Sequence, residues 1–296
     1  MLNDLISICW DITSRCNDNC KYCYRNSNNS DLDIESNKII LKKLLSFGVK
    51  KISFVGGEPL LYNDLIELVK YGREIDTNNT IFSITTNAII LCDYDENQRN
   101  FYINENLLSQ ITEFFNWITF SLDASDSITQ TIIGRNKLHF DRICYLLNYF
   151  MINNIDKKIK INTVVNKLNM NELEKLYDLL LKYNVNRWKL FKFLPSRERA
   201  LKNKTMFDIT DYEFNNCVSG LLNSKDVYND NIKISINNYE DFNKSYITIS
   251  SEGMLIVYDG SSYNKKLNLL KDDINDITKY IDVNKYLQKR LDYVDL

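Results

Sequence analysis

The chain has 296 residues, 44% of them hydrophobic and 12% aromatic, which is enough for a large core and excludes a disordered chain. Its 37 basic and 39 acidic residues leave a formal net charge of −2, so no overall field favours a nucleic acid or a membrane surface as partner. The only histidine, His139, argues against imidazole-based metal sites. Seven cysteines, an odd number, indicate reduced thiols. The sequence starts without a signal-peptide pattern, and no run reaches about 18 apolar residues, so we expect a cytoplasmic protein.

Strand-like and helix-like segments alternate through the first two thirds of the chain. The apolar runs expected to be strands are 5–11, 50–55, 81–85, 117–122, 158–165 and 187–193. The segments with helical spacing of apolar residues are 37–47, 64–71, 105–115, 140–152 and 171–183. Five strand–helix units and a sixth strand predict a parallel sheet with right-handed crossovers, whose strands are buried on both faces.

The last hundred residues follow a different pattern. A charged connector precedes a helix that begins near Thr210, and segments 245–250 and 254–258 flank a Ser-Glu-Gly turn that predicts a hairpin. A terminal helical stretch is expected from about Asn275. The sequence therefore predicts an α/β fold. Residues 1–195 would form an open (βα)6 partial TIM barrel, and residues 196–296 a small C-terminal α+β extension.

Three of the cysteines, Cys16, Cys20 and Cys23, lie within eight residues of each other. Thiolates this close, in a loop after a strand, can bind one metal centre. Zinc normally takes four ligands, and neither a histidine nor a fourth cysteine is nearby. A cubane [4Fe–4S] cluster held by three thiolates would keep one iron open for another ligand. Structural zinc and an inert group of reduced thiols are the alternatives.

A second motif, Gly56-Gly57-Glu58-Pro59, follows the second expected strand and holds two of the eight glycines and one of the two prolines. Paired glycines let backbone approach a ligand closely, and a carboxylate can accept a hydrogen bond from an ammonium group. The alternative is an ordinary turn from strand to helix, with proline opening the helix.

These two motifs together, with Tyr22 before the last cysteine, resemble the radical S-adenosylmethionine (SAM) superfamily. The resemblance implies a [4Fe–4S] cluster held by the three cysteines, with SAM bound to the open iron. One-electron reduction would split SAM into methionine and a 5′-deoxyadenosyl radical that removes a hydrogen atom from the substrate. It also implies an electron donor such as flavodoxin or ferredoxin.

The resemblance further implies which residues contact SAM. The Gly-Gly-Glu-Pro segment would hold its methionine amine, and polar residues after the third and fourth strands would lie near its ribose. An arginine in the loop after the fourth strand would meet its carboxylate. The residues concerned are Tyr22, Gly56, Gly57, Glu58, Pro59, Thr86, Asn87, Ser121, Asp123 and Arg135. The alternative for the last five is a helix cap or a solvated loop residue.

Basic residues on the last two expected strands indicate an anionic substrate. By alternation Lys160 and Asn162 share one face of their strand, and Arg187 and Lys189 share one face of the next. Burying cations inside a barrel costs free energy unless an anion pairs with them, and the triphosphate of a nucleotide would be such an anion. The alternative is that these charges face solvent.

Segments 133–135, 160–166, 187–191 and 245–246 resemble viperin-like radical SAM enzymes, which dehydrate a nucleoside triphosphate to a 3′-deoxy-3′,4′-didehydro product. This resemblance implies that Lys160, Asn162, Arg187, Lys189 and Tyr246 contact the nucleotide. The chain departs from that pattern around the cysteines, where it has Arg15, Tyr24 and Arg25.

The alternatives concern both the substrate and the class of protein. Segment 194–200 resembles peptide-modifying radical SAM enzymes of the kind that mature ribosomal peptides, but no cysteine follows Cys217 to hold their auxiliary clusters. We therefore expect a small-molecule substrate, a nucleotide before a peptide. A zinc- or redox-binding protein is the alternative from a different class. The four other cysteines are expected to be small core residues, and His139 a helix cap or a surface residue.

Overall fold

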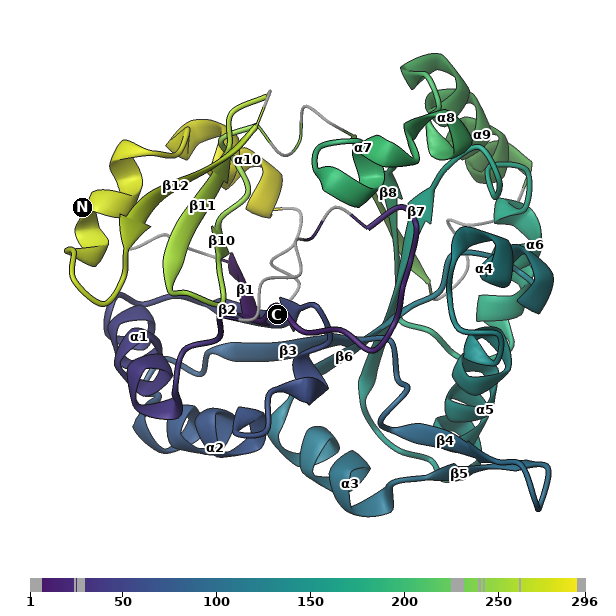
Figure 1. Cartoon of the computed structure of the whole chain (residues 1–296), viewed down its shortest axis with the longest axis horizontal. Helices are drawn as coiled ribbons and strands as arrows, with labels where there is room; N and C mark the ends of the chain where they lie inside the picture. Colours follow the sequence, from purple (N-terminus) through teal and green to yellow (C-terminus); the bar gives the residue numbers. More distant parts are fainter. Residues whose placement is uncertain are drawn as a thin grey trace.

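The computed structural model describes residues 7–23, 25, 30–224, 232–238, 241, 243–260 and 262–291. Its main feature is one curved ten-stranded sheet in the order β12-β11-β10-β1-β2-β3-β6-β7-β8-β9 (Figure 1). The six expected strands are all present in its centre and pair in parallel. They are β1 Ser7–Thr13, β2 Lys51–Gly56, β3 Ile81–Thr86, β6 Trp117–Ser121, β7 Lys158–Val165 and β8 Arg187–Lys192. Residues 5 and 6, the start of the first expected strand, lie outside the described residues.

The five expected helices connect these strands and lie along the outer face of the sheet (Figure 1). They are α1 Ile34–Ser46, α2 Leu65–Ile75, α3 Glu105–Phe114, α5 His139–Ile152 and α6 Leu173–Leu181. Helix α1 begins three residues earlier than its apolar spacing predicts, because the Asp33 carboxylate caps it by accepting a hydrogen bond from Ser36 N at 2.7 Å. The open α/β barrel predicted from the sequence is confirmed.

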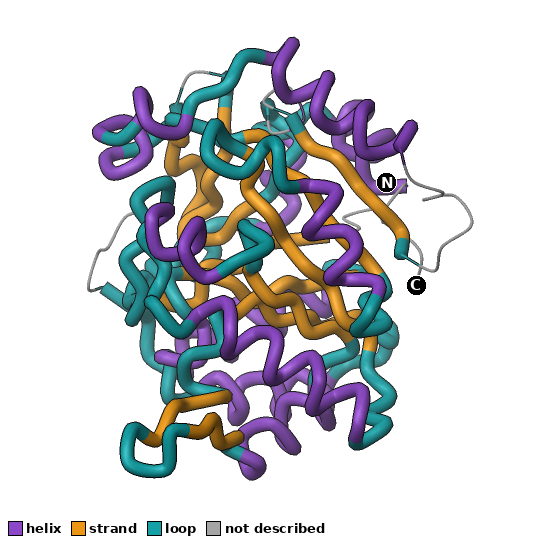
Figure 2. Tube along the Cα trace, turned by 90° about the vertical axis from the view of Figure 1, so that its right-hand side faces the viewer, coloured by secondary structure: helices purple, strands orange, loops and turns teal. Residues whose placement is uncertain are grey.

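Several elements escape the sequence prediction. The hairpin of β4 Cys92–Asp95 and β5 Asn100–Ile103 forms a separate small sheet, which projects below the barrel in Figure 2. The short elements η1 Pro59–Leu61, α4 Ser127–Ile133, α7 Glu198–Lys202 and α8 Lys204–Phe207 follow strands of the barrel. These elements are too short for the spacing of their apolar residues to predict a helix.

The C-terminal residues extend both edges of the barrel sheet. After α9 Asp211–Ser224, strand β9 Lys233–Asn237 pairs in parallel with β8, and β10 Thr248–Ile249 pairs in parallel with β1. The expected hairpin forms between β10 and β11 Met254–Tyr258, and β12 Tyr263–Asn268 continues it. The last elements in the described part of the chain are η3 Ile274–Lys279 and α10 Val283–Leu291. A division at residue 195 stays a prediction, and one sheet runs through both parts.

The two faces of the sheet differ in chemistry. Side chains that point outward, such as Ile8, Phe54, Phe82 and Ile118, are fully buried beneath the helices. The inward positions of β7 alternate with them and are partly exposed, because they face a cavity instead of packed helices. His139 is also fully buried and is the first residue of α5, whose N-cap is Leu138, so its expected role as a helix cap or surface residue is wrong.

Candidate active site

A cavity runs through the inside of the barrel. Cys16, Cys20 and Cys23 line one end of it, beyond the last residue of β1. Lys51 and Trp117, the first residues of β2 and β6, line the other end. The cavity therefore spans a whole strand, a length of about 17–20 Å.

The lining comes from matching positions on neighbouring strands. Strand register places Ser53 beside Ser83, Ser83 beside Trp117, and Thr119 beside Lys160. Because neighbours in register point to the same face, the strands supply a ring of small polar and cationic groups. The strand residues that line the cavity are Cys9, Lys51, Ser53, Val55, Gly56, Ser83, Thr85, Thr86, Trp117, Thr119, Ser121, Lys160, Asn162, Val164, Phe191 and Lys192.

The path from β1 into the cysteine loop is held by Asp31, a residue that the sequence analysis missed. Its carboxylate accepts hydrogen bonds from Thr13 Oγ1 at 2.6 Å and from Ser14 N at 2.9 Å, and it forms an ion pair with Arg15. Asp31 thereby orients the three residues that precede the first cysteine of the motif.

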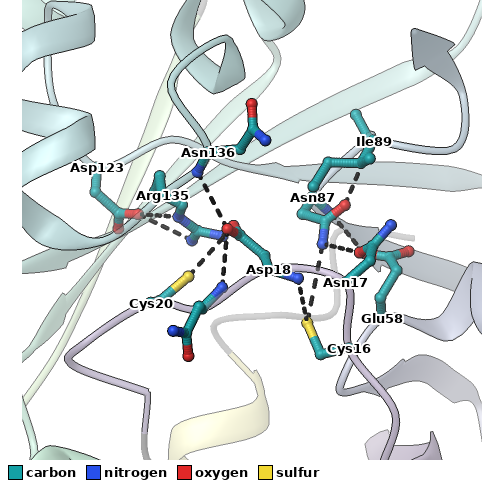
Figure 3. A network of polar contacts seen from close by, with 12 residues as sticks. Cys16, Asn17, Asp18, Cys20, Glu58, Asn87, Ile89, Asp123, Arg135 and Asn136 are labelled. Atoms are coloured by element: carbon teal, nitrogen blue, oxygen red, sulfur yellow. Dashed lines mark hydrogen bonds and ion pairs between the residues drawn. The ribbon is translucent and has the colours of Figure 1, made fainter.

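Asp18 connects the cysteine loop to the rest of the site, as Figure 3 shows. Asp18 N donates to Cys16 Sγ at 3.5 Å, and the Asp18 carboxylate accepts from Cys20 Sγ at 3.4 Å and Asn136 N at 3.1 Å. The same carboxylate forms an ion pair with Arg135 at 3.2 Å. The sequence contained no signal for this role, because the arginine that holds Asp18 lies 117 residues away.

Burial favours the neutral form of two of these thiols. Burial raises the pKa of Cys16 to about 11 and that of Cys20 well above its ordinary value. Iron binding would therefore have to displace their protons. In the described part of the chain, no three His, Cys, Asp or Glu side chains are grouped as ligands of a single metal ion. Three thiolates on a cubane bind three different iron atoms, so they need not converge on one point.

The paired glycines bring two loops together. A Cβ on Gly57 would lie 2.1 Å from the Arg15 carbonyl oxygen, and a Cβ on Gly56 would lie 2.4 Å from that of Thr13. Gly57 N donates to Thr13 O at 2.8 Å, and Glu58 N donates to Arg15 O at 2.7 Å. The glycines are thus required by the backbone that leads into Cys16. Their expected close approach to a ligand stays a prediction.

Glu58 joins the ends of β2 and β3. Its carboxylate accepts from Thr86 Oγ1 at 2.7 Å, Asn87 N at 2.7 Å and Leu60 N at 3.2 Å. Burial raises the pKa of Glu58 to about 7, although these hydrogen bonds oppose the shift. Asn87 then reaches the cysteine loop through Asn17 Oδ1, at 2.8 Å (Figure 3).

Tyr22, Asp123 and Arg135 form one buried network at the edge of the cavity. Tyr22 OH donates to Asp123 Oδ2 at 2.6 Å, and Arg135 Nη2 lies 2.9 Å from the same oxygen. Arg135 therefore faces two carboxylates, those of Asp123 and Asp18. Its expected contact with the SAM carboxylate stays a prediction.

The remaining expected site residues divide into two groups. Thr86, Asn87, Ser121, Lys160, Asn162 and Tyr246 line the cavity. Within the described part of the chain, Asn162 Oδ1 is buried without a hydrogen-bond partner, which fits a polar ligand. Pro59, Arg187 and Lys189 lie outside the lining set: Pro59 is buried at the start of η1, and the two cations are buried behind aromatic rings.

Several further lining residues had not been expected as site residues, among them Arg25, Trp117, Lys192 and Tyr263. Arg25 forms an ion pair with Asp11 of β1, and Lys192 forms one with Asp211 at 2.6 Å. Burial raises the pKa of Tyr263 to about 12. Tyr246 and Tyr263 belong to the C-terminal part of the chain, so that part closes one side of the cavity.

The fold and the cysteine loop together define a partial-barrel enzyme built around an iron–sulfur site. The sequence matches the Radical SAM superfamily over residues 10–180, more than half of the chain. The protein therefore belongs to the radical SAM superfamily, whose cofactors are a [4Fe–4S] cluster and SAM. This membership makes the chain an enzyme and favours the cluster over zinc.

Relatives and solved structures agree with this assignment. A protein of Flammeovirga pacifica named S-adenosylmethionine-dependent nucleotide dehydratase is 30% identical over 227 residues, 73% of this chain and 72% of that protein. One of the same name from Lacinutrix mariniflava is 25% identical over 96% of this chain and 57% of its own length. The crystal structure of Streptococcus suis SuiB bound to S-adenosylmethionine has a TM-score of 0.68 at 18% identity, covering 96% of this chain and 67% of that one; it supports the fold.

No helix in the described part of the chain combines the length and the apolarity needed to cross a lipid bilayer.

Proposed function

We propose that this radical SAM enzyme acts on a nucleoside triphosphate and dehydrates it to the 3′-deoxy-3′,4′-didehydro nucleotide. The observation that carries the proposal is a single cavity with thiols at one end and Lys51, Trp117 and Lys160 towards the other. A nucleotide spanning this cavity would place its ribose between a radical source and a cationic region. The names of the nucleotide dehydratase relatives support the same substrate class.

Each end of the cavity has a proposed set of residues. Cys16, Cys20 and Cys23 would hold the cluster, and the cluster with SAM supplies the hydrogen-abstracting radical when bound. SAM would lie against Tyr22, Gly56, Gly57, Glu58, Thr86, Asn87, Ser121, Asp123 and Arg135, and Pro59, buried at the start of η1, would support this segment from outside the cavity lining. The nucleotide would meet Lys160, Asn162 and Tyr246 directly, with Arg187 and Lys189 adding positive charge from behind aromatic rings.

The proposed reaction balances with two single electrons. A 3′,4′-didehydro product requires that C4′ lose hydrogen and C3′ lose its hydroxyl. Bound SAM would supply the 5′-deoxyadenosyl group that accepts this hydrogen atom. The hydroxyl takes up one electron and one proton and leaves as water. An external protein such as flavodoxin or ferredoxin would supply this electron and the one that cleaves SAM.

The test is an anaerobic assay of the reconstituted enzyme with SAM, a reductant and each of the four ribonucleoside triphosphates. We expect one of them to raise the yield of 5′-deoxyadenosine above background, together with a nucleotide that has lost one water by mass spectrometry. Equal background release with all four would refute the nucleotide proposal and favour a peptide substrate.

A variant separates substrate binding from cluster binding. Lys160→Met removes a charge that lines the cavity and should abolish the nucleotide-dependent excess while uncoupled SAM cleavage and iron content stay at wild-type values. Lys157→Met, one residue before β7, is the matched control, because Lys157 is not among the residues that line the cavity.

A further inference from the structure

The cysteine loop forms a thin wall between the cavity and the outside of the molecule. Cys20 and Tyr22 are buried and line the cavity, whereas Lys21, the residue between them, is exposed. Electron transfer between proteins weakens steeply with distance, because tunnelling falls off exponentially. A redox partner that touched Lys21 would be separated from a cluster on Cys20 by one layer of backbone.

Two helices brace the outer side of this wall. On one side, Lys21 Nζ donates a hydrogen bond to Ile132 O of α4 at 3.1 Å. On the other side, Asn203 Nδ2, between α7 and α8, donates to Lys21 O at 3.0 Å. Arg199 Nη1 of α7 donates to Cys20 O at 3.4 Å, and Figure 1 shows α7 beside this part of the chain. Helices α4 and α7 therefore frame the exposed lysine.

Both framing helices expose large apolar side chains. Ile128 and Ile132 of α4 are 71% and 45% exposed, and because they are four residues apart they share one face of the helix. Leu201 of α7 is 53% exposed. Single apolar residues scattered over a surface are ordinary, but three large ones on the two helices that frame one loop indicate a contact with another protein.

Positive charge gathers at the same place. The segments that form the wall and its braces, 14–23, 126–137 and 197–208, contain eight basic and four acidic residues, although the whole chain has a net charge of −2. Three of the basic residues are paired with carboxylates: Arg15, Arg135 and Lys204. The other basic residues in these segments still outnumber the acidic ones, so this surface is positive.

Three lysines border the exposed apolar side chains: Lys21, Lys137 and Lys202, all of them exposed. The carbonyl that Lys21 contacts is neutral, so the ammonium group keeps its charge. A basic surface with apolar side chains at its centre complements an acidic protein and accelerates its association. A radical SAM enzyme needs single electrons from outside, and this surface lies directly over one of its cysteines.

We propose that an acidic one-electron carrier protein docks on the face formed by Lys21, Ile128, Ile132, Lys137, Leu201 and Lys202. One electron passes through the wall towards Cys20: the carrier is oxidised, the iron–sulfur site is reduced, and no bond forms or breaks in this step. The proposal rests on the proposed function, whose electron donor it places on the structure, but not on the identity of the substrate.

The experiment compares a protein reductant with a small one. Reconstituted enzyme and SAM receive either a reduced, acidic bacterial flavodoxin or dithionite, and 5′-deoxyadenosine is measured at increasing reductant concentration. Lys137→Glu/Lys202→Glu should raise the half-saturating flavodoxin concentration about tenfold or more, because like charges then meet across the interface. The rate with dithionite and the iron content should stay at wild-type values, and high salt should reduce the difference.

A matched control makes the same change of charge elsewhere. Lys42→Glu/Lys50→Glu alters two exposed lysines on α1 and just before β2, and it should leave the half-saturating flavodoxin concentration unchanged. Ile128→Ser/Leu201→Ser should raise that concentration without any change of charge. Carbodiimide coupling, followed by mass spectrometry, should join carboxylates of flavodoxin to lysines of the docking face.

Three results would overturn the proposal. They are equal half-saturating flavodoxin concentrations in wild type and Lys137→Glu/Lys202→Glu, cross-links only to other lysines, and an equal loss of SAM cleavage with both reductants. The last result would mean that these lysines serve the iron–sulfur site and not the carrier. If no nucleotide is turned over but the flavodoxin-specific loss of SAM cleavage is observed, the docking site is supported and the proposed function alone fails.

Discussion

The contact between the glycine pair and the cysteine loop leads to a sharp prediction for Gly57→Ala. The new methyl carbon would lie 2.1 Å from the Arg15 carbonyl oxygen and 2.5 Å from its carbon. Real Cβ contacts essentially never fall below 3.0 Å, so the two loops must separate by about 1 Å. Arg15 immediately precedes Cys16, and the hydrogen bond from Glu58 N to Arg15 O spans the same gap.

Two measurable losses follow from that displacement. A shift of about 1 Å at a reacting centre can cost roughly 100-fold in rate, so reductive cleavage of SAM to 5′-deoxyadenosine should fall by about that factor. The strained packing and the weakened hydrogen bond should lower the free energy of unfolding by about 1–3 kcal/mol. The assays are chromatographic quantification of 5′-deoxyadenosine, iron analysis after anaerobic reconstitution, and urea unfolding.

Gly220→Ala is the matched control for this change. Gly220 lies within α9, and an added Cβ would meet nothing within 4 Å. This variant should keep wild-type activity and gain about 0.5–1 kcal/mol, because alanine is the better helix former. Wild-type cleavage rates and iron content in Gly57→Ala would refute the reasoning, since the two loops would then not need their close approach.

Two predictions concern stability. Burial lowers the pKa of His139 well below its ordinary value, so the folded state stays neutral while the unfolded state takes up a proton below about pH 6.5. The contribution of neutral His139 to the free energy of unfolding is complete above that pH and is lost as the pH falls, by up to about 1.4 kcal/mol per pH unit. Between pH 7.5 and pH 5.5, the free energy of urea unfolding should therefore decrease less in His139→Gln than in the wild type. Equal decreases in the two proteins would contradict this explanation. Tyr286 OH accepts from Ser7 N at 2.7 Å and donates to Ser7 O at 2.8 Å, both buried. Tyr286→Phe should therefore cost about 1–3 kcal/mol without changing iron content, and an unchanged unfolding midpoint would count against that tie between α10 and β1.

The C-terminal hundred residues show how far local pattern reaches. The hairpin signal at Ser251-Glu252-Gly253 predicts that β10 and β11 pair, since a hairpin is decided by neighbouring residues. The pattern did not indicate that β10 would also pair in parallel with β1, or β9 with β8. Strands β1 and β10 are more than two hundred residues apart in the sequence, and β8 and β9 are about forty residues apart. No local periodicity encodes such pairings.

The amino-acid sequence by itself determined the chemistry of one end of the site. Cys16, Cys20 and Cys23 are close in sequence, and the Gly-Gly-Glu-Pro segment follows a strand, so both are visible without a structure. Strand alternation likewise put Lys160 and Asn162 on the inner face, where they line the cavity.

Only the tertiary structure decided what supports these residues. Asp31 holds the segment from β1 into the cysteine loop, and Asp18 holds that loop through Arg135, which lies in the loop after α4. Trp117 reads in sequence as an ordinary strand residue, yet it ends the cavity because β2, β7 and β8 bring their first residues around it. The near-neutral charge of the chain conceals this arrangement, since a sum over residues carries no information about which charges the fold gathers in one place.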